Sequence, residues 1–430
     1  MAKLANHPSR VYHHFVADPI VEAPSLDVPV DAAPEMAGTR NRIPGVAGTR
    51  FHLILMLSAR LSRLNGVWLA VYIEVFTLLT LFAWANRMES LDIGLVVSLA
   101  FLTLAVLDWV ALSQLPRRGR SFGPVAPPLL VLVPLRAAVT IVPVLIPLSP
   151  LWIATLVEVG NFALTGYVLD SLWGEPFRLT VTRLTLRSAK LRGAPPLRVL
   201  HVSDFHVERL TRREEKMIKW INELRPDLIV YTGDLLNFSY LDDERARADC
   251  LRLLTQLHAP LGVYGIPGTP LIDTPEVQAA LYAQTPHIHW LQNETIEIEG
   301  YPQLQIIGLT CTHDPTLDAP RFTHVRAAVP PEKFTLLLYH SPDLMPEASH
   351  AGIDLYLCGH THGGQIRLPL WGAVVTSSLY GKRYEMGRYQ SGSTTLYVSR
   401  GIGLEGKGAP RMRFLCPPEM ELFELRGSES

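Results

Sequence analysis

The chain carries a run of glycines and histidines, Gly359-His360-Thr361-His362-Gly363-Gly364, that is suited to holding metal ions. Glycines let a loop bend, so the two alternate imidazoles of this run can face two adjacent ions. Further polar donors each follow an apolar run typical of a buried strand. They are Asp204, His206, Asp234 and His340. This set of carboxylates and imidazoles predicts a centre with two divalent metal ions.

Asp234 is the candidate for the ligand shared by both ions. Such a ligand is needed because two cations a few ångströms apart repel strongly, and a carboxylate offers two oxygens. Asp234 follows Gly233 and the apolar run Leu228–Tyr231. A Gly-Asp pair in this position can also be only a turn, so the assignment depends on the other donors.

The other donors also have simpler interpretations when each is taken alone. Asp204 and His206 lie two residues apart after an apolar run, and Asp204 could instead cap a helix. His340 ends the apolar run Phe334–Tyr339 and could be a core histidine with satisfied hydrogen bonds. Taken together and in this order, the motifs indicate one shared metal centre.

The order and spacing of these motifs resemble the calcineurin-like metallophosphoesterases, in particular bacterial membrane-attached members with the signature GHTHGGQ, here Gly359 to Gln365. The resemblance covers residues 197–425. It implies an α/β fold, a layered sandwich of two mixed sheets flanked by helices. It also implies that Asp204, His206, Asp234 and His362 bind one metal ion and that Asp234, His340 and His360 bind the other.

The resemblance implies a hydrolase that acts on ester or anhydride bonds of phosphate. Mn²⁺, Fe or Zn²⁺ would suit the ligands. A hydroxide activated by the two ions would attack phosphorus, and the ions would offset the developing charge. Asp234 and His340 would then serve catalysis as well as metal binding. Arg400 lies in a segment that resembles one near the family's cleft, where it could contact a phosphate; the alternative is a surface ion pair.

One motif departs from the family pattern. Where the family has Gly-Asn-His-Asp, this chain has Gly268-Thr269-Pro270-Leu271. Thr269 replaces the asparagine that would complete the second metal site, which makes that site uncertain. Pro270 replaces the histidine that would assist the leaving group, and proline cannot transfer a proton. General acid assistance typically contributes ~10²- to 10⁴-fold, so its loss slows the expulsion of poor leaving groups most.

Three consequences of this departure remain open. The site could act on an activated substrate such as a phosphoric anhydride, it could recruit Asp273, His313 or Asp314, or it could only bind its ligand. Local chemistry favours a loop acid for Asp273 and a turn for His313-Asp314-Pro315. The alternative to an enzyme is therefore a catalytically weak or inactive binding or sensor module.

Composition and the pattern of apolar residues divide the chain before residue 171 into a tail and a predicted transmembrane domain. With 430 residues, 48% of them hydrophobic and only 18% charged, the chain is apolar for a soluble enzyme. Residues 1–50 predict a disordered tail without a cleavable signal peptide, and residues 51–170 predict an all-α transmembrane domain of about four spans. The spans are Val67–Trp84, Ile93–Leu112, Val125–Leu148 and Leu151–Leu169, each close to the ~20 residues needed to cross a bilayer.

Each predicted span contains one ionisable residue, and these are Glu74, Asp108, Arg136 and Glu158. Arg136 could pair with one of the acids as a structural clamp, or the charges could form a pocket for a lipid headgroup. Basic residues before the first span, between the second and third, and after the fourth place the tail and residues 171–430 in the bacterial cytoplasm. Three spans instead of four would export that domain.

The domain of residues 171–430 alternates short apolar runs with amphipathic segments, which predicts an α/β region. The expected strands are Leu197–Val202, Leu228–Tyr231, Gly262–Ile266, Leu304–Leu309, Thr335–Tyr339, Ile353–Leu357, Leu396–Ser399 and Met420–Leu425. The expected helices are Arg212–Leu224, Glu244–Leu257 and Pro275–Ala283. Such sheets place their sites on loops at strand ends.

The expected partners follow from the charge and the membrane segments. A net charge of −1 gives no indication of nucleic acid. Tethering confines the domain to a layer rich in phospholipids and lipid-linked nucleotides, so we expect the membrane and a phosphorylated small-molecule or lipid-linked substrate as partners. A related branch cleaves the diphosphate of a nucleotide-linked acylated glucosamine. The four cysteines are widely spaced and are expected to be reduced.

Overall fold

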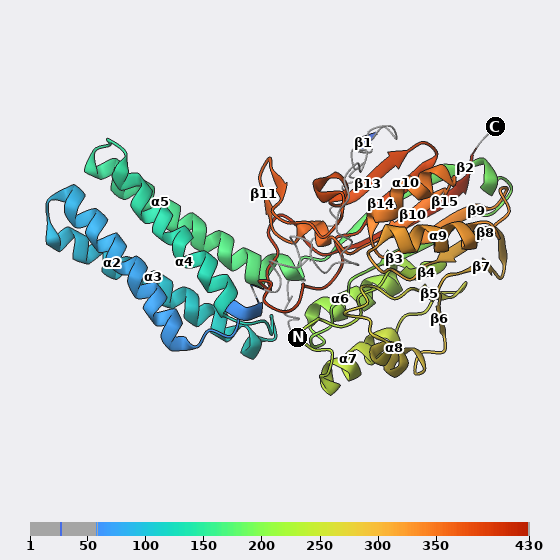
Figure 1. Ribbon diagram of the computed structural model, residues 1–430, viewed down its shortest axis with the longest axis horizontal. Helices are drawn as coiled ribbons and strands as arrows, with labels where there is room; N and C mark the ends of the chain where they lie inside the picture. The colour runs from blue at the N-terminus through green and yellow to red at the C-terminus, as the bar shows by residue number, and fades with distance from the viewer. Residues whose placement is uncertain (1–25, 28–56, 58, 429–430) are drawn as a thin grey trace, which may run out of the picture.

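The computed structural model of the protein describes residues 26–27, 57 and 59–428, which form two parts lying end to end (Figure 1). Helices α2 to α5 make an elongated bundle, and the described strands lie in the second part. The predicted disordered tail falls outside the described residues, apart from the short strand β1 (Leu26–Asp27).

The helical bundle agrees with the predicted spans. Its members are α2 (Gly66–Met88), α3 (Leu91–Gln114), α4 (Ala126–Ile141) and α5 (Pro150–Leu169). By length and composition, four helices in this region could each cross a membrane. Pro127 and Pro128 fit α4 because they lie in its first turn, where a missing N–H breaks no helical hydrogen bond. Large apolar side chains such as Leu99 and Phe162 are exposed on the outside of the bundle, as expected of a surface that faces lipid.

Arg136 links three helices inside this bundle. Its Nε and Nη2 donate to the carboxylate of Asp108 on α3 at 2.5 and 2.8 Å, and its Nη1 donates to Asn161 on α5 at 3.2 Å. The arginine and its acid are both buried. A buried charge in an apolar bundle requires such pairing. The contacts agree with the clamp interpretation, with Asp108 as the partner acid.

The second part contains two large sheets and one short hairpin. The six-stranded sheet has the order β2-β15-β3-β4-β5-β6, and the seven-stranded sheet has the order β1-β13-β14-β10-β9-β8-β7. The first contains β2 (Thr180–Ser188), β3 (Leu197–Val202), β4 (Leu228–Tyr231), β5 (Val263–Gly265), β6 (Ile288–Trp290) and β15 (Glu419–Gly427). The second contains, besides β1, β7 (Glu294–Ile298), β8 (Tyr301–Gly308), β9 (Phe334–Leu338), β10 (Leu355–Cys358), β13 (Gly387–Ser391) and β14 (Thr394–Val398). The hairpin joins β11 (Arg367–Leu368) to β12 (Gly372–Ala373).

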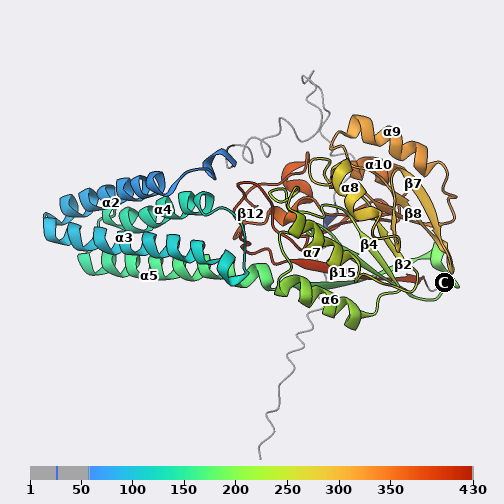
Figure 2. The same ribbon diagram turned by 90° about the horizontal axis from the view of Figure 1, so that it is seen from below.

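The sheets pack face to face through one apolar cluster and are covered by helices on their outer faces. Val199 and Val230 of one sheet meet Leu336 and Leu355 of the other in this cluster. The outer helices are α6 (Arg212–Leu224), α7 (Glu244–Leu254), α8 (Pro275–Tyr282), α9 (Pro315–Arg326) and α10 (Met345–His350). Figure 2 shows α6 and α9 on opposite sides of the strands. The predicted fold class, two mixed sheets flanked by helices and preceded by apolar helices, is confirmed.

Parallel pairing brings the ends of several strands to one edge. Strands β3, β4 and β5 are parallel to one another in one sheet, and β8, β9 and β10 are parallel in the other. Their carboxyl ends therefore lie side by side, and the loops that follow them can converge. Each of the six predicted ligands stands in one of these loops, from two to four residues after its strand.

Candidate metal centre

The structure brings the six predicted ligands together. Asp204, His206, Asp234, His340, His360 and His362 are all buried. Asp204, His206 and His362 form one group in which the donor atoms lie within 4.8 Å of one another, and Asp204, Asp234 and His340 form a second. Burying this many ionisable groups is costly unless cations balance the carboxylates. The residues thus fit a centre for divalent metal ions.

The loops that carry the donors adopt an unusual backbone. Positive φ angles, between 40° and 68°, occur at Asp204, His206, Asp234, His313, His360 and His362. Non-glycine residues rarely adopt this region, and each such residue costs roughly 1–3 kcal/mol. Strained backbone tends to cluster where function requires a particular side-chain direction. Five of these residues are predicted ligands, and the sixth, His313, is not.

The first group is arranged around two imidazoles. His206 Nε2 and His362 Nε2 lie only 3.0 Å apart. His206 Nε2 is 3.6 Å from Asp234 Oδ2, and His362 Nε2 is 3.7 Å from Asp204 Oδ1. The Nδ1 atoms of both histidines are buried without a hydrogen-bond partner. Two lone-pair nitrogens facing each other beside two carboxylates form a suitable set of ligands for one cation.

Asp234 belongs to the second group and also approaches His206 of the first. Its Oδ1 accepts the backbone N–H of Thr269 at 2.7 Å, and its Oδ2 is 3.2 Å from His340 Nε2. His340 Nδ1 donates to the carbonyl of Thr232 at 2.6 Å, so its Nε2 points into the site. Burial acts to lower the pKa of His340, but the charge of Asp234 outweighs it and raises that pKa to about 9. A cation bound here would compete with that proton.

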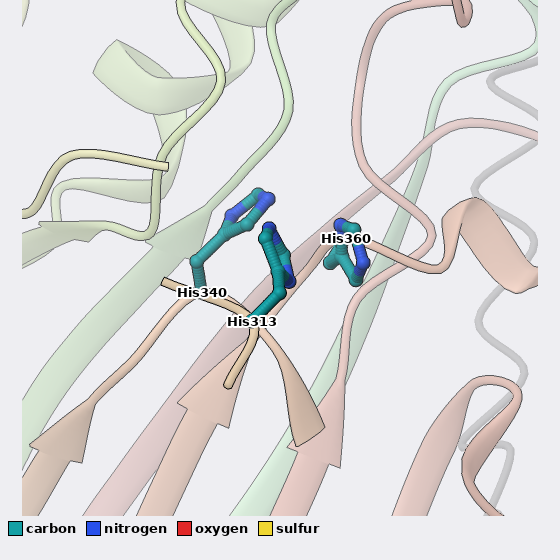
Figure 3. A group of neighbouring side chains, drawn as sticks. All are labelled: His313, His340 and His360. Carbon is teal, nitrogen blue, oxygen red and sulfur yellow. The ribbon is translucent and has the colours of Figure 1, made fainter. Parts of the chain in front are cut away.

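A third group includes His313, which the sequence pattern placed in a turn. His313, His340 and His360 place their donor atoms within 4.8 Å of one another, and Figure 3 shows the three rings facing a common space. The ring centroid of His313 is 4.2 Å from that of His360. His313 lies in a bend, as the sequence predicted, but its imidazole also takes part in this cluster. Asp314 caps helix α9 by accepting the backbone N–H of Thr316 at 2.9 Å.

Burial lowers the basicity of three histidines in the centre. It lowers the pKa of His313 to about 3, with the nearby charge of His340 acting in the same direction. Burial also holds the pKa values of His360 and His362 well below the usual range, and neighbouring histidines add to this. These imidazoles are neutral at pH 7. The neutral form is the one that binds metal ions.

Asp273 holds the loops of the centre in place through their backbone. It is buried, and its carboxylate accepts the backbone N–H groups of Asp234, Leu235 and Gly268 at 2.9, 3.0 and 2.7 Å. Burial, together with the charge of Asp234, raises the pKa of Asp273 to about 6. The loop acid expected from the sequence is thus the residue that fixes the Asp234 loop against the Gly268 loop.

Two glycines allow loops to approach the carboxylates closely. A Cβ at Gly359 would lie 1.9 Å from Asp204 Oδ2, and a Cβ at Gly268 would lie 2.3 Å from Asp234 Oδ1. Both distances are far below van der Waals contact. Any side chain at these positions would displace a carboxylate of the centre.

Arg400 contacts other residues than the six predicted ligands. Its Nε lies 2.7 Å from Glu419 Oε2, and its Nη2 donates to Thr180 Oγ1 at 3.0 Å. These contacts join the segment after β14 to β15 and β2. The ion pair expected as the alternative for Arg400 is present, but it is largely buried. A role in binding phosphate remains a prediction.

Comparison with known proteins agrees with this geometry. Residues 197–268 match the calcineurin-like phosphoesterase family. The chain is 31% identical over 260 residues to the uncharacterized metallophosphoesterase YkuE of Bacillus subtilis, covering 59% of this chain and 88% of YkuE. It is 27% identical over 326 residues to the UDP-2,3-diacylglucosamine pyrophosphatase LpxG of Chlamydia trachomatis, covering 60% and 94%, respectively.

A third relative is the phosphodiesterase YaeI of Escherichia coli. The chain is 29% identical to it over 246 residues, which cover 54% of this chain and 83% of YaeI. The matches to these three relatives cover more than four fifths of each of them. Together with the fold and the buried cluster of carboxylates and imidazoles, they lead to one conclusion: the chain belongs to the calcineurin-like metallophosphoesterase family.

Proposed function

We propose that the protein is a membrane-anchored, metal-dependent phosphoesterase that hydrolyses a phosphate ester or diphosphate bond of a lipid-linked substrate. In this proposal, residues 51–170 anchor the protein and residues 171–430 carry the chemistry. The observation that carries it is the convergence of two carboxylates and four imidazoles, in the family's order, at the carboxyl edge of the two sheets. His206, His360 and His362 each keep one buried nitrogen without a hydrogen-bond partner, which a purely structural core rarely does.

Each metal ion would have its own set of protein ligands. Asp204, His206, Asp234 and His362 would hold the first, and Asp234, His340 and His360 would hold the second. Bound ions of this kind supply Lewis-acid activation of water and stabilisation of charge on the phosphoryl group. The protein orients the donors for this task. Thr232 fixes the tautomer of His340, and Asp273 fixes the backbone at Asp234.

The leaving group of the proposed substrate is a good one. Pro270 stands where a proton donor would assist departure, and it has no proton to give. The phosphate group expelled from a phosphoric anhydride departs without such assistance more readily than the alkoxide expelled from an alkyl ester. The bond cleaved would therefore be a diphosphate in preference to an alkyl ester, which is also the bond class in the name of the relative LpxG.

A hairpin beside the helical bundle supports a substrate held in the membrane. The β11–β12 hairpin lies on the side of the α/β part that faces the apolar helices (Figures 1 and 2). Its tip exposes Leu370 and Trp371, and the ammonium group of Lys382 lies 4.5 Å from the ring centre of Trp371. Exposed aliphatic, aromatic and cationic side chains suit the interface between lipid and water.

In the proposed topology the α/β part lies in the cytoplasm. Four spans return the chain to its starting side, and the connection between α3 and α4 carries Arg117, Arg118 and Arg120. The connection between α2 and α3 contains Glu89 and no such cluster. The positive-inside rule then places the α/β part in the cytoplasm.

A second candidate is a binding or sensor module with little or no catalysis. The observation in its favour is the pair Thr269 and Pro270, which replaces both an expected ligand and the expected proton donor. Such a module would retain the first ion and bind a phosphorylated lipid or partner without turnover. The retention of all the other donors favours the enzyme.

The test is hydrolysis by the full-length protein in detergent, reconstituted with Mn²⁺ or Zn²⁺. A nucleotide-linked acyl-sugar diphosphate and an aryl phosphodiester would serve as substrates, with Asp234→Asn as the inactive reference. We expect wild-type turnover of the diphosphate to exceed that of the variant by at least a hundredfold. Equal rates for wild type and variant on both substrates, with metal bound, would favour the sensor module.

A further inference from the structure

We propose that His313 is the missing protein ligand of the second metal ion. In this site His313, His340 and His360 supply three imidazoles, and Asp234 supplies the carboxylate shared with the first ion. The family has an asparagine ligand where this chain has Thr269. In our proposal His313 supplies that missing ligand. The inference rests on the proposed function because it concerns the metal centre of the same enzyme.

Distances place the ring of His313 within the centre. The donor atoms of His313, His340 and His360 all lie within 4.8 Å of one another (Figure 3). The hydroxyl of Thr269 is 3.2 Å from both His313 Nε2 and His340 Nε2. Each ligand stands roughly 2.0–2.2 Å from its metal, so the ligands of one ion lie up to about 4.4 Å apart, which is near the spacing of these three histidines.

The state of the nitrogen atoms also points to a shared cation. His360 Nε2 is buried and has no hydrogen-bond partner. A buried polar nitrogen without a partner is costly in a folded protein. The other nitrogen of His313, Nδ1, lies 3.5 Å from Cys311 Sγ, a contact that can orient the ring with Nε2 toward the site. A cation between these rings would satisfy the nitrogen of His360.

The backbone of His313 supports the same assignment. Its φ of 59° falls in the same left-handed region as those of Asp204, His206, Asp234, His360 and His362. A turn could use glycine or asparagine here at lower cost, so a strained histidine indicates that the imidazole itself is needed. His313 is also only 5% exposed, which a histidine in an ordinary surface turn is not.

The ligand chemistry gives the second site its own metal preference. Three imidazoles and one carboxylate favour Zn²⁺ or Fe²⁺ over harder ions such as Mg²⁺. The first site, with two carboxylates and two imidazoles, is richer in oxygen and accepts Mn²⁺ more readily. The inferred centre is therefore asymmetric, with the second site selective for Zn²⁺ or Fe²⁺.

Thr269 offers a competing explanation that can be tested directly. Its hydroxyl lies close to His340 and is also 3.3 Å from Asp234 Oδ2, so the hydroxyl itself could be the replacement ligand. Thr269→Val removes the hydroxyl and keeps the shape of the side chain. His313→Ala removes the imidazole and keeps the hydroxyl. The two variants therefore separate the two ligands.

The experiment is elemental analysis of Zn²⁺ bound per chain in the full-length protein after reconstitution and removal of free metal. We expect two ions in the wild type, two in Thr269→Val, one in His313→Ala and two in the control His258→Ala, an exposed histidine outside the centre. His313→Asn, which restores an amide ligand, is expected to hold the second ion more weakly than the wild type and to provide a second variant if His313→Ala does not fold.

Two results would overturn the inference: two ions retained in His313→Ala, or one ion in both the wild type and His313→Ala. Its failure and that of the proposed function are distinguishable. A chain that binds two ions through His313 but hydrolyses no phosphate compound leaves the inference standing and removes the enzyme. Hydrolysis by a chain that binds the same number of ions with and without His313 supports the proposed function and overturns the inference about His313.

Discussion

The carboxylate of Asp273 accepts the backbone N–H of Asp234 at 2.9 Å and thereby holds the proposed bridging ligand from behind. The same carboxylate accepts two further backbone N–H groups, those of Leu235 and Gly268. One buried side chain thus connects the loop after β4 to the loop after β5. The position of the bridging carboxylate depends on a residue that does not point into the centre.

Removing this support is expected to destabilise the α/β part. Asp273→Ala leaves three buried N–H groups without acceptors, at about 1–3 kcal/mol each. The melting temperature should fall by roughly 6–12 °C for a loss of about 3 kcal/mol in a domain of this size. Asp273→Asn keeps one acceptor oxygen and should lose less. The exposed Asp242→Ala is the control, and a melting temperature of Asp273→Ala equal to this control would refute the role of Asp273.

Replacing the shared carboxylate should remove metal and activity together. Asp234→Asn keeps the size of the side chain but loses the charge that balances two cations. We expect fewer than two ions per chain by elemental analysis and a loss of hydrolysis of at least a hundredfold. His258→Ala, with an exposed side chain, should change neither quantity. Full activity in Asp234→Asn would exclude a shared carboxylate.

Metal removal is expected to lower stability as well as activity. A ligand that binds only the folded chain stabilises it by about 2.7 kcal/mol when present at a hundred times its dissociation constant. Dialysis against a chelator should therefore lower the melting temperature of the α/β part by several degrees, and added Zn²⁺ or Mn²⁺ should restore it. An unchanged melting curve across this cycle would show that the buried histidines do not hold metal ions.

Arg400 provides a test that separates support from catalysis. Its guanidinium pairs with the buried Glu419, and breaking a buried pair by removing one partner costs about 3–5 kcal/mol. Arg400→Ala should therefore lower the melting temperature, while Arg400→Ala with Glu419→Gln should recover part of the loss. The metal content should stay the same in both variants. Lost hydrolysis at an unchanged melting temperature would instead indicate contact with the phosphate.

The sequence predicted most of the architecture because apolar runs determine it. Strands β4 and β9 are largely apolar and buried on both faces, and the predicted bounds of each lie within one residue of the observed bounds. Strand β2 is not among the expected strands because Thr180–Ser188 has only three apolar residues, Val181, Leu184 and Leu186, and they break the strict alternation typical of a strand. Strand β6 has only three residues, too few for a periodic signal.

The position of His313 in the centre could not be predicted from the sequence pattern. The residue follows the apolar run of β8 as the other donors follow theirs, and that signal was available. Its meaning depends on the sheet order, because β8 lies next to β9 and so brings His313 beside His340. Adjacency of strands that are distant in sequence cannot be read from local spacing. The turn chemistry of Asp314 and Pro315 therefore dominated the interpretation.

The ion pair inside the helical bundle gives the last prediction. Arg136→Met leaves the carboxylate of Asp108 buried without its partner, so this acid must be protonated or draw water into the bundle. Arg136→Met with Asp108→Leu replaces both charges by apolar groups, which is often neutral or stabilising for a buried pair. We expect the melting temperature of the single variant in detergent to lie below that of the double variant and of the wild type. Glu74→Gln, at an exposed position of α2, is the control. If the single and double variants melt at the same temperature, Arg136 does not act as a clamp through Asp108.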